Sequence, residues 1–414
     1  MPSATRQYEL VLLGATGYTG NLAAEYIQEH VATDLKWAIA GRNGQKLAQI
    51  AEELKKMNPD RVQPAIEVVE QKSDQLKVLA EKTQVLITTV GPYARWGEPV
   101  VEACANAGTH YLDVTGETPF TYDMLQKYHD TAKRNGSMII PHCGIDSVPA
   151  DILPYLCVKE IRSKLSVGVK SCINSLQKSS GKISGGTALT AITLVESYPL
   201  TFIGKAMNPY ALSPIPKPKG QAREGIMTKV LGYRYVPDLG ILTTSPQAGS
   251  DTGIVYRSWA LFDGGEWYGK NFSFAEFFRA PSALIGTLIH YVLSFGMVAL
   301  YFAPFRWFLK KLAYEPGQGQ TKEETAKNEM RYKCIATSDS PEAKRAMSSF
   351  EFVGGGYYMT GMLVVEAAMT VLRGEEESLA KRLGGMVTPA CLEMEYVERL
   401  RKAGISIECG MMED

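Results

Sequence analysis

The sequence lacks an excess of charge of either sign. Lys and Arg total 44 among 414 residues and Asp and Glu also total 44, so the formal net charge is zero. Aromatic residues make up only 9% of the chain. Binding to nucleic acid depends on a basic surface, and stacking on single-stranded RNA also depends on aromatic side chains. We therefore expect no nucleic-acid partner.

Paired cysteines are also absent, because the seven cysteines include no CxxC motif. They are scattered over positions 104, 143, 157, 172, 334, 391 and 409. Structural zinc sites use paired ligands at short spacing, so we predict no metal. An odd, dispersed set of cysteines suits a reducing compartment. Met1–Gln7 also lacks the apolar core of a secretory signal, and we expect a cytoplasmic protein.

Charged residues are missing from one long segment, Ala280–Phe305, which Arg279 and Arg306 bracket. Its length is in the range that spans a bilayer. The segment can therefore be interpreted as a core helix, a membrane-surface element or a spanning helix. Internal glycine, proline and histidine residues argue against a simple span. Trp307 and Lys311 follow directly, and mixed aromatic and cationic residues are typical of an interfacial anchor. We favour peripheral membrane contact, or an apolar gate for the substrate, over a span.

What the sequence does contain, over residues 1–150, is a regular alternation of two kinds of segment. Six short runs are rich in β-branched or apolar residues: Tyr8–Leu13, Lys36–Ala40, Ile66–Val69, Val85–Val90, His110–Val114 and Ser137–Pro141. Five amphipathic stretches separate them: Gly20–His30, Gln45–Met57, Asp74–Lys82, Glu98–Ala107 and Thr121–Asn135. This pattern predicts an α/β domain with a doubly wound parallel sheet of the Rossmann type.

A second, α+β domain with a mainly antiparallel sheet is expected over residues 151–356. It opens with a helix-like run, Val148–Ile161, and Pro199–Pro218 is expected to be a loop. Its strand-like runs are Leu165–Gln177, Ile254–Phe262, Trp267–Phe274, Met330–Ala336 and Ser349–Val353. We expect this domain to bind the substrate and to offer a surface for a homodimer. Residues 357–414, with helices over Met359–Leu372 and Pro389–Ala403, are expected to pack back on the first domain.

A glycine-rich motif, GATGYTG, follows the first predicted strand and opens a helix. Glycines in this position let the backbone turn tightly and bring its N–H groups against a pyrophosphate. The spacing is GxxGxxG, and the alternative is a purely structural turn. The residues expected to bind the cofactor here are Gly14, Thr16, Gly17, Tyr18, Thr19 and Gly20.

The end of the second predicted strand indicates which dinucleotide is bound. A site specific for NAD has an acidic residue there, which accepts hydrogen bonds from the ribose 2′-hydroxyl. This chain has Arg42 and Asn43, with Lys46 one helical turn on. Because a guanidinium group pairs well with a 2′-phosphate, we predict NADPH. The alternative for Arg42 is a solvated surface side chain.

Two further strand ends are expected to line the nicotinamide half of the cofactor. The fourth strand is followed by Gly91, Pro92 and Tyr93, where the glycine allows close backbone approach. The fifth is followed by a segment that contains Asp113, Gly116 and Glu117. The two acids either bind the cofactor amide or cap the next helix.

Eight motifs together resemble the saccharopine dehydrogenase-like oxidoreductases, and especially their trans-acting enoyl reductase branch. They are GATGYTG (14–20), AGR (40–42), VGPYARWGEPVVEAC (90–104), GTHYLDVTGE (108–117), HCGIDSVPAD (142–151), SGGT (184–187), EPGQGQTKEE (315–324) and MTGMLVVEAA (359–368). The resemblance implies a nicotinamide cofactor and a substrate held between two domains. For the enoyl reductase branch it implies that NADPH reduces a C=C bond of an acyl thioester on a chain made by a separate polyketide synthase.

The candidates for the chemistry are Tyr93, His142 and Asp146, which follow the fourth and sixth predicted strands. Tyr93 could donate a hydrogen bond or proton, or form an aromatic wall beside the nicotinamide. A histidine at a strand end is more often structural, and Asp146 is favoured as the cap of the next helix. The SGGT turn could bind a carbonyl or phosphate group, with Thr187 as a helix cap as the alternative.

The sequence thus predicts an NADPH-dependent oxidoreductase that reduces a C=C bond of a small-molecule or carrier-bound acyl substrate. An imine or carbonyl reductase on the same scaffold is the alternative among enzymes. True saccharopine dehydrogenases need basic residues that hold several carboxylates, and the strand-like runs of the second domain supply no such cluster. From another class of protein, a membrane- or lipid-associated nucleotide-binding protein without turnover also fits, since fold alone does not fix function.

Overall fold

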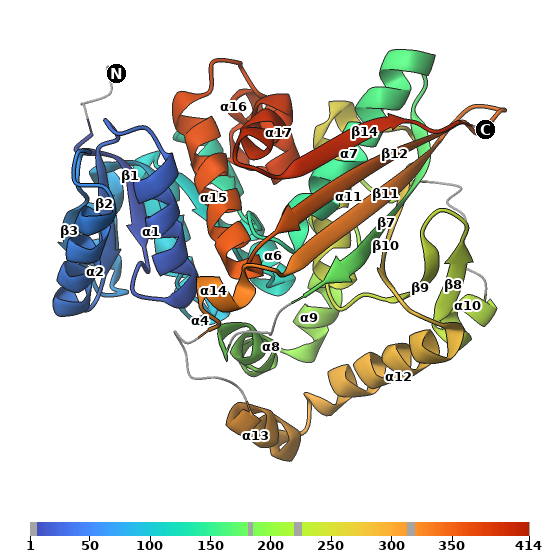
Figure 1. Cartoon of the computed structure of the whole chain (residues 1–414), viewed down its shortest axis with the longest axis horizontal. Helices are drawn as coiled ribbons and strands as arrows, with labels where there is room; N and C mark the ends of the chain where they lie inside the picture. The colour runs from blue at the N-terminus through green and yellow to red at the C-terminus, as the bar shows by residue number, and fades with distance from the viewer. Residues whose placement is uncertain (1–5, 181–184, 219–225, 313–318, 414) are drawn as a thin grey trace.

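The computed structural model, shown in Figure 1, describes residues 6–180, 185–218, 226–312 and 319–413. It contains two seven-stranded sheets, and the first has the order β13-β6-β5-β4-β1-β2-β3 with every pair of neighbours parallel. Its strands are β1 (Tyr8–Leu13), β2 (Trp37–Gly41), β3 (Ala65–Val68), β4 (Thr83–Thr88), β5 (His110–Asp113), β6 (Met138–Ile140) and β13 (Gly385–Met386). Its surrounding helices are α1 (Tyr18–His30), α2 (Gly44–Met57), α3 (Ser73–Glu81), α4 (Tyr93–Trp96), α5 (Glu98–Ala107) and α6 (Thr118–Arg134).

The central strands of this sheet are apolar because helices cover both of its faces. All five residues of β2 are buried, as are five of the six in β1. The predicted α/β class with a doubly wound parallel sheet is therefore confirmed, and the six predicted strands match β1 to β6 to within two residues at each end.

The second sheet has the order β14-β12-β11-β7-β10-β9-β8. Only β7 and β10 pair in parallel, so the predicted mainly antiparallel sheet is confirmed. Its strands are β7 (Val169–Ser179), β8 (Tyr233–Val236), β9 (Gly240–Thr244), β10 (Ser273–Arg279), β11 (Glu329–Ser338), β12 (Arg345–Val353) and β14 (Ser406–Met411). Helices α7 (Ser147–Leu165) and α11 (Ala248–Leu261) pack on it.

Helix α15 (Gly356–Arg373) packs against α1 and stands between the two sheets (Figure 1). A Cβ atom on Gly361 would lie only 3.0 Å from the backbone nitrogen of Ala23, so the glycine permits this close helix contact.

The remaining helices are α8 (Gly185–Ser197), α9 (Leu200–Ala206), α10 (Ile226–Leu231), α12 (Ala283–Ala299), α13 (Ala303–Leu312), α14 (Lys322–Thr325), α16 (Leu379–Leu383) and α17 (Glu393–Lys402), with 3₁₀ turns at Asp263–Gly265 and Pro389–Leu392. The division at residues 150 and 356 stays a prediction.

Three predicted elements of the second half are wrong. Ile254–Phe262 lies almost wholly in helix α11, because a helix that is buried on nearly all sides has the same apolar run as a buried strand. The predicted strand Trp267–Phe274 begins only at Ser273, since the preceding aromatic residues pack together in a turn. The predicted loop Pro199–Pro218 contains the short helix α9.

The apolar segment forms α12 and α13, which lie at the lower edge of Figure 1. The first half of α12 packs on β8 and β9, where the Thr243 hydroxyl donates to Gly286 O at 2.6 Å. Leu284 is 81% exposed and Phe295 is 69% exposed, so a core helix is the wrong interpretation of this segment. In the described part of the chain no single helix has the length and apolarity to cross a bilayer. Only α12 and α13 taken together meet those criteria, and the pair is bent by 113°.

Candidate functional site

The glycine motif lies between β1 and α1, and its three glycines have different roles. Gly14 has a φ of +98°, and a Cβ atom there would lie 2.8 Å from the Thr89 hydroxyl oxygen. A Cβ atom on Gly20 would overlap the carbonyl oxygen of Gly14. Gly17 has a φ of −84°, and its Cβ atom would approach Gly14 O only to 3.3 Å. The fold thus requires glycine at 14 and 20, whereas at 17 it tolerates a side chain.

Helix α1 begins at Tyr18, and no side chain caps its N-terminus at Gly17. The N–H groups of the first turn of a helix carry partial positive charge and bind anions such as a pyrophosphate. The loop of Gly14, Thr16, Gly17 and Thr19 therefore fits a dinucleotide. The Tyr18 hydroxyl donates to the carbonyl oxygen of Gln320 at 2.5 Å, a contact 302 residues apart in sequence that the sequence analysis did not anticipate.

Arg42 and Lys46 are exposed at the carboxyl end of β2. This end adjoins the glycine motif, since the backbone N–H of Gly14 donates to Ala40 O at 2.9 Å. Within the ranges that the structure describes, no ion pair occupies the side chains of Arg42 and Lys46, which leaves both cations available to a 2′-phosphate. Asn43 instead caps α2, because its Oδ1 accepts from the backbone N–H of Lys46 at 3.0 Å.

Glu117 and Asp113 build the loops beside the predicted nicotinamide position. The Glu117 carboxylate accepts from the backbone N–H groups of Tyr93 and Ala94 at 2.7 and 2.8 Å, so it caps α4 rather than the helix that follows it. Asp113 accepts from the Tyr111 hydroxyl at 2.7 Å and from the backbone N–H of His142 at 3.0 Å. Burial raises the pKa of Asp113 to about 6 and that of Glu117 to about 7.

Tyr93 is buried, and its hydroxyl donates to Thr88 O at 3.0 Å and accepts from the backbone N–H of Val114. Burial raises the pKa of this phenol well above its usual range. The two hydrogen bonds join β4 to the loop after β5. This position suits the hydroxyl for stabilising these segments and not for donating a proton to a substrate. Gly91 and Pro92 precede it at the end of β4, and Gly116 lies in the loop after β5.

His142 is fully buried and has a φ of +61°. Its Nε2 atom is 2.8 Å from the Thr121 hydroxyl and its Nδ1 atom 3.3 Å from that of Ser147. Burial lowers the pKa of His142 to about 3, so the ring is neutral at physiological pH and is a poor proton donor.

Asp146 is the N-cap residue of α7, as the sequence predicts, but its side chain makes no capping hydrogen bond. Its carboxylate accepts from Gln247 Nε2, at the start of α11. A Cβ atom on Gly116 would lie 3.9 Å from Asp146 Oδ2. Asp146 is partly exposed, unlike His142, and desolvation raises the pKa of its carboxyl group. Of the three candidates for the chemistry it is the one best placed to exchange a proton.

Two acids that the sequence analysis missed lie behind Asp146. Asp251 in α11 and Glu276 in β10 are both buried. Burial, together with the charge of Glu276, raises the pKa of Asp251 well above its usual range. The Ser147 hydroxyl donates to Asp251 Oδ1 at 2.6 Å, which links Asp251 to His142. No motif points to these residues, because the elements that hold them, α11 and β10, differ from the strands predicted there.

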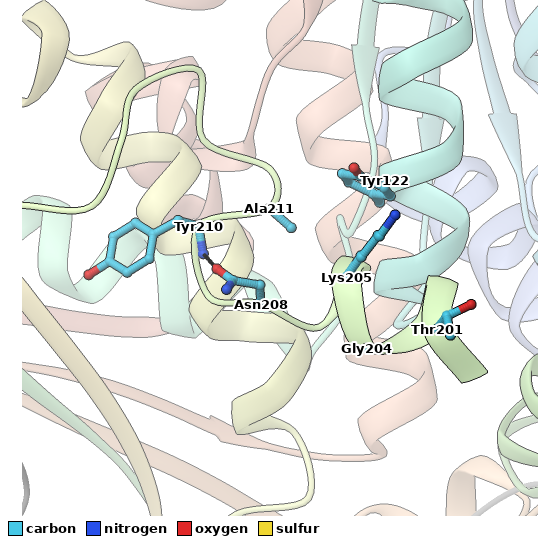
Figure 2. Close-up of a pocket in the computed structure, with 7 residues that line it drawn as sticks. All are labelled: Tyr122, Thr201, Gly204, Lys205, Asn208, Tyr210 and Ala211. Carbon is cyan, nitrogen blue, oxygen red and sulfur yellow. Dashed lines mark hydrogen bonds between the residues drawn. The ribbon is translucent and has the colours of Figure 1, made fainter. Parts of the chain in front are cut away.

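A hollow of about 610 Å³ lies outside this group of residues (Figure 2). It is lined by Tyr122 of α6 and by six residues of α9 and the following turn, Thr201, Gly204, Lys205, Asn208, Tyr210 and Ala211. Figure 2 shows Lys205 close to Tyr122, while the ring of Tyr210 points away from both. None of the predicted site residues lines it. In the SGGT turn, Ser184 and the side chain of Thr187 lie outside the described residues.

Comparison with known proteins agrees with this geometry. Residues 10–140 match the family model of the saccharopine dehydrogenase NADP binding domain. A Mycobacterium tuberculosis protein with the provisional name of trans-acting enoyl reductase is 30% identical over 99% of both chains. The chain belongs to the saccharopine dehydrogenase-like oxidoreductase family. A trans-acting enoyl reductase of Mycobacterium ulcerans is 29% identical over 98% of this chain and 99% of its own.

Among solved structures, apo saccharopine dehydrogenase (L-Glu forming) from Saccharomyces cerevisiae has the same fold. The TM-score is 0.56 at 12% identity, and the match covers 98% of this chain and 100% of the yeast chain. The predicted family, with its trans-acting enoyl reductase branch, is confirmed, and so is the NADPH cofactor. This saccharopine dehydrogenase-like chain is an NADP-dependent oxidoreductase.

Replacement of Arg42 tests how the family member selects its cofactor. Arg42→Ala is expected to weaken NADPH binding by roughly ten- to a hundredfold and to leave NADH binding unchanged, because a charge-assisted pair with phosphate contributes about 1.5–3 kcal/mol. Calorimetric titration with both cofactors measures this. Lys55→Ala removes an exposed cation from the far end of the same helix and serves as the control. Equal losses for the two cofactors would contradict the assignment.

Proposed function

We propose that this oxidoreductase reduces the C=C bond of an α,β-unsaturated acyl thioester, in the manner of a trans-acting enoyl reductase. The observation that carries the proposal is the match over nearly the whole chain to proteins of that name, which extends through the second domain. The relatives are called trans-acting, and we accordingly propose that a separate protein such as a polyketide synthase presents the acyl chain. Formation of a homodimer through the second domain is part of the same proposal.

The chemistry needs a hydride, a proton and loops that hold the two reactants in place. Bound NADPH supplies a hydride to the β-carbon of the substrate. The resulting enolate then takes a proton at its α-carbon, which restores the thioester carbonyl and completes the saturated product. Asp146 is the proton donor in this proposal, because it is partly exposed and the pKa of its carboxyl group is raised. Tyr93 and Glu117 hold the loops that position the two reactants.

The arrangement favours an acyl substrate over an amino-acid imine. A substrate with several carboxylates requires cations beside the reacting bond, whereas the group beside the carboxyl edge of the first sheet consists of Asp146, Asp251 and Glu276. Acidic groups offer a substrate carboxylate no cation with which to pair. A neutral thioester needs no such partner.

The test is a comparison of substrates with the purified full chain. We expect NADPH oxidation, followed by its absorbance, with 2-enoyl thioesters of increasing chain length, and little with saturated ketones or with imines formed from amino acids. Faster turnover of an imine than of every enoyl thioester would support the other enzyme class. NADPH binding without turnover of any substrate would support a binding protein.

We also propose that α12 and α13 lie on a membrane surface, which would bring the enzyme to long acyl chains. The exposed apolar side chains of α12 include Leu288 and Val292, at 62% and 61% exposure. On α13, Trp307 is 59% exposed and Lys311 lies over its ring at 3.8 Å, a pairing suited to the interface with anionic lipid headgroups. The Arg306 side chain forms an ion pair at 3.6 Å with Glu196 of α8, which connects α13 to the rest of the protein.

A double substitution, Leu284→Asp with Phe295→Asp, is expected to reduce binding to anionic lipid vesicles at least about tenfold, since each change removes roughly 2 kcal/mol of apolar burial. Vesicle flotation measures the bound fraction. Val68→Asp with Val353→Asp replaces two apolar residues of similar exposure away from α12 and is the control. Equal binding by both variants would contradict membrane contact through α12, and an apolar gate for the substrate would then be the better interpretation.

A further inference from the structure

The two carboxyl oxygens of Asp146, the proton donor of the proposed function, have different surroundings. Oδ1 accepts a hydrogen bond from Gln247 Nε2, at the start of α11. Oδ2 would lie 3.9 Å from a Cβ atom on Gly116, which makes it the nearest described atom outside the neighbours of that glycine. Gly116 belongs to the loop after β5, which the sequence predicts to line the nicotinamide half of the cofactor. One oxygen is therefore bound to the second domain, and the other faces the predicted cofactor loop.

The backbone on both sides of Asp146 is held by hydrogen bonds. The carbonyl oxygen of Ile145 accepts from the Tyr332 hydroxyl of β11 at 3.3 Å. On the other side, the Ser147 hydroxyl donates to Asp251 Oδ1 at 2.6 Å. Because these contacts fix the chain at both neighbours, the side-chain torsion angles of Asp146 decide where each of its oxygens points.

One hydrogen bond determines those torsion angles. In the part of the chain that the structure describes, Gln247 is the only residue that donates to the Asp146 carboxylate. Gln247 is itself fixed, because it is the N-cap residue of α11 and its backbone N–H donates to the Ser245 hydroxyl oxygen at 3.2 Å. The Ser245 hydroxyl in turn donates to the buried Glu276 carboxylate at 3.3 Å. The second domain thus holds the amide that orients Asp146.

The same hydrogen bond selects the oxygen that carries the proton. A carboxylate only accepts hydrogen bonds, so an ionised Asp146 requires that Gln247 present Nε2 to Oδ1. Oδ2, on the side of Gly116, is then the oxygen to which a proton returns. An acid whose reacting oxygen is fixed in direction delivers its proton to one face of a bound enolate.

We propose that Gln247 is a positioning residue for the proton transfer: its amide holds Oδ1 of Asp146, so that the proton sits on Oδ2 and reaches one face of the substrate. This inference rests on the proposed function. When hydride has reached the β-carbon, the Oδ2–H bond of Asp146 breaks and a C–H bond forms at the α-carbon from the electron pair of the enolate. The enolate C–O bond becomes the thioester C=O bond again. The Asp146 carboxylate then takes up a proton from solvent through its exposed side.

The configuration of the product at its α-carbon tests this role, because a residue that only supports the fold would not change it. A 2-methyl-2-enoyl thioester is reduced by the full chain in deuterated water, and the configuration at the new C–D bond is determined by NMR. We expect one configuration from the wild-type protein. Gln247→Met keeps the length of the side chain and removes the donor. It is expected to give both configurations and to lower kcat by roughly ten- to a hundredfold, with KM and NADPH affinity unchanged.

The matched control is Gln177→Met, in the same domain. The Gln177 amide donates to the Ser175 hydroxyl oxygen at 2.9 Å and makes no contact with Asp146 in the described ranges. This variant should keep the wild-type rate and a single configuration.

Gln247→Glu gives a second test that does not depend on the folding of Gln247→Met. An ionised glutamate cannot donate to Asp146 Oδ1, whereas a protonated one can. The kcat of this variant relative to the wild-type protein is expected to rise as the pH falls, and the single configuration should return.

The outcomes separate this inference from the proposed function. An active wild-type enzyme, together with a single configuration and an unchanged rate in Gln247→Met, or in Gln247→Glu at every pH, would overturn the inference alone. A wild-type protein that binds NADPH and reduces no enoyl thioester would overturn the proposed function, and with it the role assigned to Gln247.

Discussion

Gly17→Val is expected to abolish NADPH binding while leaving both sheets folded. Gly17 has an ordinary backbone conformation, with φ −84° and ψ 164°, that valine also adopts. Its Cβ atom would approach Gly14 O to 3.3 Å, a contact that needs a shift of only a few tenths of an ångström. The valine side chain would instead fill the space next to the N-terminus of α1, where the pyrophosphate must meet backbone N–H groups.

Thermal unfolding with and without cofactor measures the effect. Saturation at about 100 times the dissociation constant stabilises the wild-type protein by about 2.7 kcal/mol, and Gly17→Val should show no such increase in Tm. Without cofactor its Tm should stay close to that of the wild-type protein. Gly20→Val is the contrasting variant, since its Cβ atom would overlap Gly14 O and lower the Tm even without cofactor. A Gly17→Val protein that NADPH still stabilises would contradict the placement of the pyrophosphate.

The second large effect concerns acid stability and His142. The pKa of this buried ring is lowered to about 3, whereas an exposed histidine in the unfolded chain has a pKa of about 6.5. The unfolded state therefore binds a proton first as the pH falls below about 6.5, and the contribution of the neutral ring to stability is lost progressively towards pH 3. Between pH 7 and pH 4 this costs about 3 kcal/mol.

His142→Asn removes the titrating group and suits the φ of +61°, which asparagine adopts more readily than most residues. The free energy of unfolding of the variant, measured in urea, should improve relative to the wild-type protein by about 3 kcal/mol between pH 7 and pH 4. Asp151 and Glu117 have raised pKa values of about 7, so they stabilise the folded state more as the pH falls. Because both proteins contain these two acids, their effect cancels in the difference between the unfolding free energies of the variant and the wild-type protein. His30→Asn, at an exposed histidine, is the control. Parallel pH curves for wild-type and His142→Asn would show that His142 is not held neutral by the fold.

The first domain could be predicted closely because its signals are local. Short apolar strands, amphipathic helices and a glycine turn after β1 each need only neighbouring residues to be recognised. Arg42 could be placed at the carboxyl end of β2 for the same reason, since the residue after β2 follows from the strand itself. The roles of single side chains were harder. Glu117 caps α4, 24 residues earlier, and Asp146 pairs with Gln247, 101 residues later.

In the second domain, local sequence patterns were not enough to predict helix α11 or the two buried acids. Helix α11 is buried from Gly253 to Ala260, so its apolar run has no polar face from which a helical period could be read. No sequence pattern therefore marked Asp251 in the first turn of this helix. Glu276 lies in a strand with three phenylalanines, and no motif marks it either. Only the pairing of β10 with β7 and the packing of α11 on α7 bring these acids behind Asp146. Contacts of that kind depend on tertiary structure and leave no motif in the sequence.

The central claim is that hydride from NADPH reduces a C=C bond, and isotope transfer tests it most directly. NADPH deuterated at C4 of the nicotinamide, prepared as each stereoisomer, is incubated with a 2-enoyl thioester and the full chain, and the product is analysed by mass spectrometry and NMR. We expect a saturated thioester with one deuterium at the β-carbon from one stereoisomer only, and a solvent-derived hydrogen at the α-carbon. Deuterium on a carbinol or amine carbon, with the C=C bond intact, would contradict it.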